Sequence, residues 1–287
     1  MDWPRERLAR FAGKVVIVSG AGAPKGPGWG NGRATAIAFA AEGAKVVAVD
    51  LHADRAEETR AMIASNSGEA IAVTANVTDR EQIAALVAKT MATYGRIDVL
   101  HNNVGVAGGE SGMIEATSEE AWDREMAVSA KSVFLTMQAV LPTMIAQGAG
   151  VITNTSSTLA VRFIERPSLT YTAAKAAVEA MTQSVAVSHG PLGIRANCLR
   201  IGFMDTPLNR SGWAHRIDGD AALERAMEAS ASVVPLRRMG TGLDSASAAL
   251  FLASDEASYL NGVILPVDGG VELAPVHIPG LLETSKR

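Results

Sequence analysis

Residues 15–33 read VVIVSGAGAPKGPGWGNGR, and this stretch contains the pattern that decides the fold. Four β-branched residues, Val15 to Val18, predict a buried strand, and the glycine-rich segment after them runs straight into an alanine-rich helical pattern. A strand, a glycine loop and a helix in this order place backbone N–H groups and a helix N-terminus where they bind a pyrophosphate. A P-loop would need Gly-Lys followed by Ser or Thr, which this stretch lacks, so a nucleotide triphosphatase is disfavoured.

The rest of the chain repeats the alternation of short apolar runs with amphipathic, alanine-rich stretches. This predicts an α/β fold: a doubly wound parallel sheet of about seven strands with helices on both faces, because apolar runs without polar alternation are typical of strands covered on both sides. The strands are expected at residues 15–18, 46–49, 70–73, 97–100, 151–154, 194–197 and 263–266. The helices are expected at residues 33–42, 54–65, 79–94, 119–146, 171–188 and 244–253.

The whole chain, residues 1–287, is interpreted as a single domain, since no repeat, low-complexity linker or long charge run divides it. Its regular core is expected at about 13–273, followed by a C-terminal tail at 274–287. The segment at about 204–242 holds several prolines and glycines around one short helical pattern. It predicts either a lid over a substrate site or a surface insertion without a role.

Composition excludes several classes of function. The 26 Lys and Arg are balanced by 30 Asp and Glu, mixed along the chain, so no concentrated basic surface for nucleic acid is expected. The one cysteine, Cys198, cannot form an intramolecular disulfide, and the five scattered histidines show no metal-ligand spacing, so no metal site is expected. A charged N-terminal stretch and the lack of a long apolar run predict a cytoplasmic protein without a membrane span.

An acid follows the second predicted strand, which ends in Val49-Asp50. A carboxylate at this place accepts hydrogen bonds from the adenosine ribose hydroxyls and repels the 2′-phosphate of NADP. Asp50 therefore predicts NAD as the cofactor. Lys25 and Arg33 are nearby cations that either soften this discrimination or are solvated surface charges.

A phenol and an ammonium group lie four residues apart, at Tyr171 and Lys175, near the start of a predicted helix. This spacing puts both on one face of the helix. A neighbouring ammonium favours the phenolate and lowers a tyrosine pKa toward neutrality, which suits proton transfer. The pair by itself is also compatible with an ordinary exposed helix face.

Together these motifs resemble the short-chain dehydrogenase/reductase family over residues from about 13 to 273. The resemblance is carried by the glycine loop, Asn76-Val77, Asn102-Asn103-Val104-Gly105, Ser156-Ser157, Tyr171 with Lys175, Arg195-Ala196-Asn197, the stretch from Gly202 to Pro207, and Pro266-Val267-Asp268-Gly269-Gly270. It implies a Rossmann-type fold, a nicotinamide cofactor, a small-molecule substrate and a homotetramer or dimer. The predicted helices at 119–146 and 171–188 would form one interface.

The resemblance also implies roles for individual residues. Tyr171 would be the general acid/base, Ser157 would orient the substrate carbonyl, and Lys175 would lower the Tyr171 pKa and hold the nicotinamide ribose. The residues implied in cofactor binding, besides Tyr171 and Lys175, are Gly20, Gly30, Gly32, Asp50, Asn76, Val77, Asn103, Gly202 and Thr206.

The sequence departs from the family pattern in its loop and its proton relay. Nine residues, 21–29, separate Gly20 from Gly30, where three are usual, so the longer loop either covers the pyrophosphate or bulges into solvent. Ser129 stands where the family has an active-site asparagine that holds a relay water. A serine there either retains that water or breaks the relay.

Two further departures concern the substrate side. Ser157 lies fourteen positions before Tyr171, one more than usual, so Ser156 is a second candidate for its role. The usual Pro-Gly pair after the sixth strand is Ile201-Gly202, preceded by Arg200, which meets either an anionic group or an ion-pair partner.

The sequence therefore predicts an NAD-dependent oxidoreductase that interconverts a secondary alcohol and a ketone. The alternative is a cofactor-binding regulator or scaffold that keeps the fold and has little catalysis. The direction of the reaction and the substrate remain open, with a carbonyl reductase and a dehydrogenase of cyclic diols both compatible with the motifs.

Overall fold

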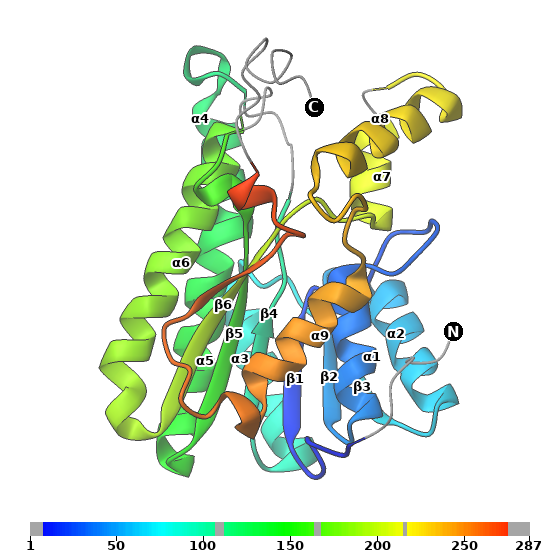
Figure 1. The fold of residues 1–287 in the computed structure, drawn as a ribbon. Helices are drawn as coiled ribbons and strands as arrows, with labels where there is room; N and C mark the ends of the chain where they lie inside the picture. Colours follow the sequence, from blue (N-terminus) through cyan, green and yellow to red (C-terminus); the bar gives the residue numbers. More distant parts are fainter. Residues whose placement is uncertain (1–7, 107–111, 164–167, 215–216, 275–287) are drawn as a thin grey trace, which may run out of the picture.

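A parallel sheet of seven strands forms the centre of the computed structural model, which describes residues 8–106, 112–163, 168–214 and 217–274 (Figure 1). The strands are β1 (Val15–Ser19), β2 (Lys45–Asp50), β3 (Glu69–Thr74), β4 (Val99–Asn102), β5 (Gly150–Ser157), β6 (Ile194–Ile201) and β7 (Ile264–Val267). Their order is β3-β2-β1-β4-β5-β6-β7. Because the winding reverses between β1 and β4, the carboxyl ends of these two strands open the crevice where doubly wound sheets bind ligands.

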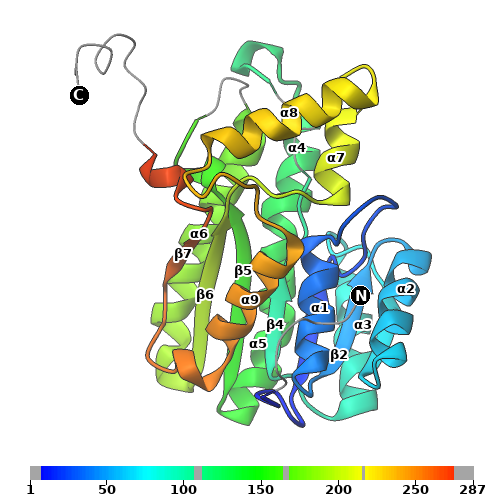
Figure 2. The same ribbon diagram turned by 45° about the vertical axis from the view of Figure 1, so that its right-hand side comes forward.

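Helices cover both faces of the sheet (Figures 1 and 2). They are α1 (Asn31–Ala41), α2 (Ala53–Ser65), α3 (Arg80–Tyr94), α4 (Glu119–Met126), α5 (Ser132–Gln147), α6 (Leu169–His189), α7 (Pro207–Ala214), α8 (Asp220–Val233) and α9 (Gly242–Ala253). On β1, Val15 and Ile17 belong to the core cluster formed with α3, α5 and α6, whereas Val16 and Val18 belong to the cluster formed with α1 and α9. The continuous apolar run thus reflects a strand buried on both sides, as predicted.

The fourth strand begins two residues later than predicted. Ile97 and Asp98 precede β4, and the Asp98 carboxylate accepts hydrogen bonds from the backbone N–H of Val15 (2.8 Å) and from Arg96 Nε (2.7 Å). The apolar pattern placed Asp98 inside the predicted strand. In the structure, the Asp98 carboxylate instead accepts the backbone N–H at the start of β1.

Two helices, α7 and α8, occupy the segment that the sequence predicted to be irregular. Both figures place them above the carboxyl ends of the strands, apart from the helices that cover the sheet. Met204, Met227 and Met239 are buried in or around this segment. The expectation of a single short helical pattern at 204–242 was therefore wrong.

A π-helical turn, η2 (Ala127–Lys131), interrupts the long helix predicted at 119–146 and separates α4 from α5. Single π turns are rare and occur frequently at functional sites. The continuous stretch Glu119–Gln147 is long and apolar enough to cross a membrane, but half of its most apolar window is buried inside the protein, as in a core helix.

A histidine lies in the middle of the sheet. His101 on β4 is fully buried, and its Nδ1 is 2.8 Å from Thr153 Oγ1, whereas its Nε2 has no hydrogen-bond partner among the described residues. Burial lowers the pKa of His101 from 6.5 to about 4. The imidazole is therefore neutral in the folded protein at pH 7.

This histidine predicts a loss of stability in acid. As the pH falls from about 6.5 to about 4, the unfolded chain binds a proton that folded His101 excludes, so folding stability present above pH 6.5 is lost. Between pH 7 and 5 the loss from this residue is about 2 kcal/mol. The free energy of unfolding, measured with urea at pH 7 and at pH 5, is expected to differ less between the two pH values in His101→Val than in the wild type, by about that amount. The control is His52→Gln, a change at an exposed histidine, and it is expected to show the wild-type difference. An equal pH dependence in His101→Val would contradict the assignment.

Candidate active site

Three side chains that the sequence singled out meet at the carboxyl ends of the central strands. Ser157 is the last residue of β5, while Tyr171 and Lys175 lie one turn apart in the first half of α6. Ser157 lies close enough to Tyr171 for its hydroxyl to favour the phenolate form of the tyrosine. Ser157 Oγ also accepts a hydrogen bond from the backbone N–H of Leu159 (3.2 Å), which fixes the rotamer of the serine. The serine is 8% exposed, so the pair lies in a sheltered position.

Lys175 is buried beneath this pair. Its Nζ donates to the carbonyl oxygens of Thr155 (2.8 Å) and Val104 (3.4 Å) and lies 5.6 Å from the centroid of the Tyr171 ring. A Cβ on Gly105 would be 3.0 Å from Nζ and 3.9 Å from Ser129 Oγ, so the lysine and Ser129 border the same small space. Ser129 is fully buried on the π turn.

Burial has the largest effect on the pKa values of Tyr171 and Lys175. It raises the pKa of Tyr171 to about 12, although the neighbouring Ser157 hydroxyl acts in the opposite direction. It lowers the pKa of Lys175 to about 8. The expectation that Lys175 draws the Tyr171 pKa toward neutrality is therefore not met by the chain alone, and the phenol is protonated at pH 7.

The structure separates the two candidate serines. Ser156 Oγ points away from Tyr171 and hydrogen-bonds Glu179 Oε1 (2.8 Å) and the carbonyl oxygen of Lys175 (3.1 Å). Its hydroxyl is fully buried and occupied by these partners. The geometry therefore favours Ser157 as the residue beside the substrate.

Arg200, for which the sequence left two roles open, forms ion pairs with two glutamates. It forms two hydrogen bonds with Glu179 (2.8 and 2.6 Å) and one with Glu272 (3.1 Å). The alternative that it binds an anionic substrate or cofactor phosphate is disfavoured, because each of its three guanidinium nitrogens already donates to a carboxylate.

The glycine loop forms a cradle without side chains at the start of α1. Gly20 has a φ of +70°, which favours glycine, and a Cβ on Gly32 would lie 2.0 Å from the Gly20 carbonyl oxygen and 2.6 Å from Asn103 Nδ2. Gly30 is the N-cap of α1, where no side-chain cap satisfies the first N–H groups. These open N–H groups and the close backbone approach fit the pyrophosphate of a dinucleotide.

Asp50 lies at the end of β2 beside this cradle. Its carboxylate accepts hydrogen bonds from the backbone N–H groups of Gly22 and His52, both at 3.0 Å, so its orientation is fixed. A Cβ on Gly22 would lie 2.6 Å from Asp50 Oδ2 and 2.5 Å from Arg55 Cβ. Sequence reasoning missed Gly22, although its need for close approach follows from the same loop pattern.

Arg33 is not a solvated surface charge, which was one of the two alternatives that the sequence left open for it. It is 7% exposed and donates to the Ala23 carbonyl oxygen (3.4 Å), Glu58 (2.6 Å) and Thr59 Oγ1 (3.2 Å). Because the sequence pattern does not reveal that α2 packs over the loop, these partners could not be predicted. Arg33 therefore anchors the long loop to α2 through its contacts with Glu58 and Thr59.

The other residues implied in cofactor binding lie at strand ends on the same edge of the sheet. Asn103 Nδ2 donates to the Gly20 carbonyl oxygen (3.2 Å), and Asn76 Oδ1 accepts from the Thr78 N–H (3.0 Å). Thr206 Oγ1 accepts from the N–H of Asn209 (3.3 Å) at the start of α7. The remaining two are Val77, which is buried, and Gly202, whose Cα faces Asp268.

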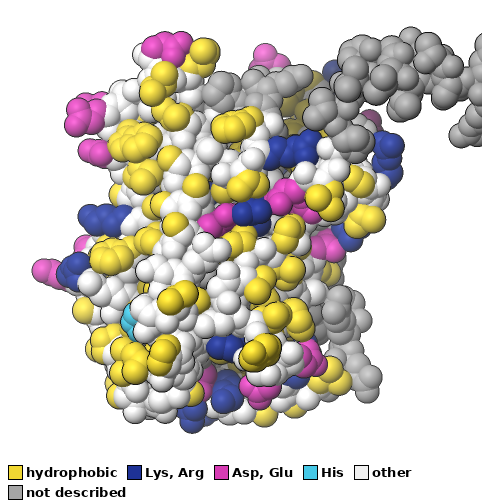
Figure 3. Space-filling model, turned by 60° about the vertical axis from the view of Figure 1, so that its left-hand side comes forward, with side chains coloured by type: hydrophobic (Ala, Val, Ile, Leu, Met, Phe, Trp, Pro, Cys, Tyr) yellow, Lys and Arg dark blue, Asp and Glu magenta, His cyan; other side chains and the backbone are white. Residues whose placement is uncertain are grey.

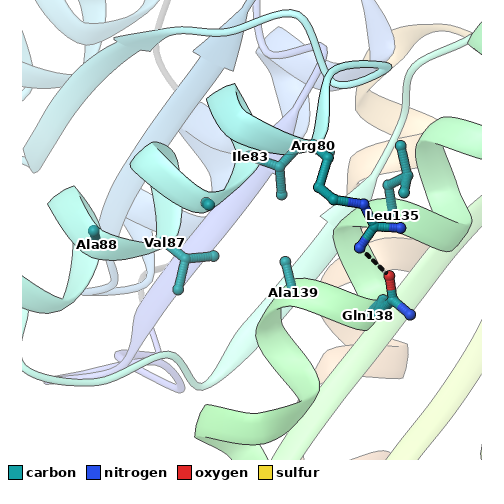
Figure 4. Close-up of a pocket in the computed structure, with 8 residues that line it drawn as sticks. Arg80, Ile83, Val87, Ala88, Leu135, Gln138 and Ala139 are labelled. Atoms are coloured by element: carbon teal, nitrogen blue, oxygen red, sulfur yellow. Dashed lines mark hydrogen bonds between the residues drawn. The ribbon is translucent and has the colours of Figure 1, made fainter.

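A surface cavity of about 380 Å³ between α3 and α5 is separate from this site (Figure 4). Arg80 Nη1 donates to Gln138 Oε1 across it at 2.7 Å, and the walls are mostly apolar. None of the residues that the sequence assigned to chemistry lines this cavity, so it is not the candidate active site.

Comparison with known proteins places the site in a family. A family model described as enoyl-(acyl carrier protein) reductase matches residues 27–272. A 2-(R)-hydroxypropyl-CoM dehydrogenase of Xanthobacter autotrophicus is 39% identical over 89% of this chain and 97% of its own length. A 3-oxoacyl-[acyl-carrier-protein] reductase of Thermotoga maritima is 36% identical over 91% of this chain and 99% of its own.

Solved structures agree with these sequence relatives. A short-chain dehydrogenase/reductase from Burkholderia xenovorans, titled as putative, superposes with a TM-score of 0.87 at 38% identity and covers 93% of this chain and 99% of its own. A levodione reductase structure superposes with a TM-score of 0.85 at 34% identity over 92% of this chain and all of its own. These relatives are dehydrogenases and reductases, and the seven-stranded parallel sheet with helices on both sides matches the solved structures. This chain is a member of the short-chain dehydrogenase/reductase family of oxidoreductases.

Proposed function

We propose that this chain is an NAD-dependent enzyme that interconverts a secondary alcohol and a ketone. The observation that carries the proposal is the convergence of Ser157, Tyr171 and buried Lys175, whose Nζ lies 5.6 Å from the centroid of the Tyr171 ring, next to the side-chain-free cradle at Gly20 and Gly32. A fixed acid/base pair beside a dinucleotide site is what hydride transfer at a carbinol carbon requires.

The proposed mechanism assigns one task to each side chain. In alcohol oxidation, the phenolate form of Tyr171 would accept the hydroxyl proton of the substrate, while Ser157 Oγ would hold the same oxygen in place. Because the phenol is protonated at pH 7 in the chain alone, this direction requires that Tyr171 first lose its proton. In ketone reduction, the protonated phenol donates to the carbonyl oxygen, and the raised pKa of Tyr171 favours this form at pH 7. A bound nicotinamide supplies the acceptor or donor of the hydride.

The residues around the pair would hold the cofactor and complete the proton path. The loop N–H groups at the start of α1 would bind the pyrophosphate, Asp50 the adenosine ribose, and Lys175 the nicotinamide ribose. Ser129 borders the same space as Lys175 Nζ, so its hydroxyl is suited to retain a relay water there. These assignments also keep Gly30, Asn76, Val77, Asn103, Gly202 and Thr206 as the proposed cofactor contacts.

The test is a fluorescence titration with NADH and NADPH, followed by turnover measurements with NAD and a panel of secondary alcohols. The proposal expects tighter binding of NADH and reduction of NAD by at least one alcohol. Binding without turnover in either direction would favour the alternative, a cofactor-binding regulator or scaffold. The ordered hydrogen bonds around Ser157 and Lys175 favour catalysis, because a scaffold has no need of them.

Asp50 provides a separate prediction about cofactor choice. Asp50→Ala removes the charge that opposes the 2′-phosphate, so the ratio of NADP to NAD dissociation constants is expected to fall by about tenfold or more, equivalent to about 1.4 kcal/mol. Asp50→Asn is the matched variant, because it keeps the size and one acceptor for the N–H groups of Gly22 and His52. If the ratio stays at its wild-type value in both variants, the long loop and not Asp50 sets the preference.

We propose a homo-oligomer, tetramer or dimer, on the basis of apolar side chains exposed on α4, α5 and α6. Phe134 is 43% and Val187 81% exposed, and Figure 3 shows apolar side chains spread over this side of the molecule. Sedimentation measurements will give the oligomer size. The single-domain organisation and the cytoplasmic location stay predictions from the sequence.

A further inference from the structure

Three charged side chains form a largely buried cluster one residue away from the candidate active site. Arg200 on β6 contacts Glu179 on α6 through both oxygens, at 2.8 and 2.6 Å, and Glu272 in the C-terminal turn η6 (Val271–Leu273) at 3.1 Å. The three side chains are only 14%, 11% and 16% exposed, respectively. Buried charges of this kind are costly unless they are paired and ordered, so the cluster is a rigid feature.

The cluster joins the two elements that carry the proposed acid/base pair. In the sheet, Arg200 lies opposite Ser156, the neighbour of Ser157. Ser156 Oγ hydrogen-bonds both Glu179 Oε1 (2.8 Å) and the backbone carbonyl of Lys175 (3.1 Å). The end of β5 and the turn of α6 between Lys175 and Glu179 are thereby held together by charge-assisted hydrogen bonds.

A second arginine holds the C-terminal turn from the other side of Ser157. Arg162, which follows η3 (Thr158–Ala160), donates to the carbonyl oxygens of Val271 (2.6 Å), Glu272 (2.8 Å) and Ala274 (3.2 Å). We call residues 270–274 the C-terminal brace. Figures 1 and 2 both show it, in red, at the upper ends of β6 and α6.

The brace is also fixed at its own base. Asp268 accepts hydrogen bonds from the N–H groups of Gly270 (2.8 Å) and Glu272 (2.7 Å). A Cβ on Gly202 would lie 2.7 Å from Asp268 Cβ, so the end of β6 packs closely against the start of the brace. Arg162 and Arg200 thus connect one rigid turn to the chain on both sides of Ser157.

We propose that Glu179, Arg200 and Glu272 are positioning residues that hold Ser157 in register with Tyr171 by joining β5, α6 and the C-terminal brace. The inference rests on the proposed reaction, in which these two hydroxyls act on one substrate oxygen. A misplacement of about 1 Å in such a pair costs up to about a hundredfold in rate. The cluster reaches Ser157 through Ser156, whereas Lys175 Nζ is held separately by the carbonyl oxygens of Thr155 and Val104. We therefore expect its effect on turnover and not on cofactor binding.

The principal test is Arg200→Lys, which keeps the positive charge and loses the fork that spans two carboxylates. We expect turnover of the alcohol to fall about tenfold, a loss of about 1.4 kcal/mol in transition-state stabilisation, with unchanged NADH affinity. A carbinol-deuterated alcohol will show a larger isotope effect, because hydride transfer becomes slower relative to product release. Arg200→Met, which also removes the positive charge, is expected to lower turnover further. The control is Arg60→Met, which breaks an exposed ion pair with Glu57 and is expected to leave turnover unchanged.

A double-mutant cycle separates positioning from general destabilisation. In a Ser157→Ala background, Arg200→Lys is expected to add little further loss, because the hydroxyl that the cluster positions is already gone. An additive tenfold loss there, or wild-type turnover in Arg200→Lys, overturns the proposal. Loss of NADH affinity in step with turnover overturns it as well.

Hydrogen exchange gives a result that needs no substrate. In Arg200→Lys, backbone amides at the end of β5 and the start of α6 are expected to exchange faster, whereas amides of β1 and β2 keep their wild-type rates. Unchanged exchange at β5 and α6 contradicts the brace. If exchange changes as expected but the wild type turns over no alcohol or ketone, the brace stands and the proposed reaction fails.

Discussion

Tyr171→Phe is expected to lower turnover by about two to four orders of magnitude in both reaction directions. The substitution removes the one hydroxyl that gives or takes the substrate proton and leaves the ring in place. NADH affinity is expected to stay near its wild-type value, because the lost group is a proton donor and Lys175 Nζ is held by the carbonyls of Thr155 and Val104.

The measurement is steady-state turnover beside an NADH titration for each variant. Tyr259→Phe is the matched control, since this tyrosine is fully exposed and should be neutral when changed. Near-wild-type turnover of Tyr171→Phe would rule out the mechanism, and a parallel loss of NADH binding would show that the phenol acts in cofactor binding instead.

Gly32→Ala is expected to remove cofactor binding and to destabilise the fold by about 3 kcal/mol. The new methyl group would overlap the Gly20 carbonyl oxygen at 2.0 Å and Asn103 Nδ2 at 2.6 Å, and both neighbours belong to the cradle. Backbone atoms cannot rotate aside as a flexible side chain can, so the loop itself must move. NADH affinity is expected to fall by about a hundredfold or more, since about 2.7 kcal/mol of loop contacts is enough for that change.

Gly212→Ala provides the control for this substitution. Gly212 lies in α7, has no atom within 4 Å of an added Cβ, and does not have a positive φ. Alanine in a helix is more favourable than glycine by about 1 kcal/mol, so this variant should be as stable as the wild type or slightly more stable. Urea unfolding and NADH titration of both variants check the pair. Wild-type NADH affinity in Gly32→Ala would contradict the placement of the pyrophosphate.

The sequence predicted the sheet because local patterns determine it. Most strands contain a short apolar run, as the run Val15 to Val18 in β1 does, whereas the order of the strands and the reversal of winding between β1 and β4 were not predicted from the sequence. The error at β4 arose because Asp98 continues an apolar run although its carboxylate serves Val15. Only one short helical pattern was expected at 204–242; the second helix was missed because α7 contains both Pro207 and Gly212.

The site was predictable only where residues act within one local motif. The spacing of Tyr171 and Lys175 on one helix face could be read directly, and so could the glycines of the loop. The partners of Arg200 could not, because Glu179 and Glu272 come from distant parts of the sequence and meet only through the order of β5, β6 and the C-terminal turn. The direction of the Tyr171 pKa shift also depends on burial in the folded chain, which spacing does not reveal.

The central claim is hydride transfer between a carbinol carbon and a bound nicotinamide. It is tested most directly by incubating the protein with NAD and a secondary alcohol that carries deuterium on the carbinol carbon, then measuring the mass of the reduced cofactor. We expect the deuterium in the reduced nicotinamide in one-to-one proportion with the ketone formed, and almost no ketone from Tyr171→Phe. Ketone formation without deuterium in the cofactor, or NADH binding with no transfer from any alcohol in the panel, would contradict it.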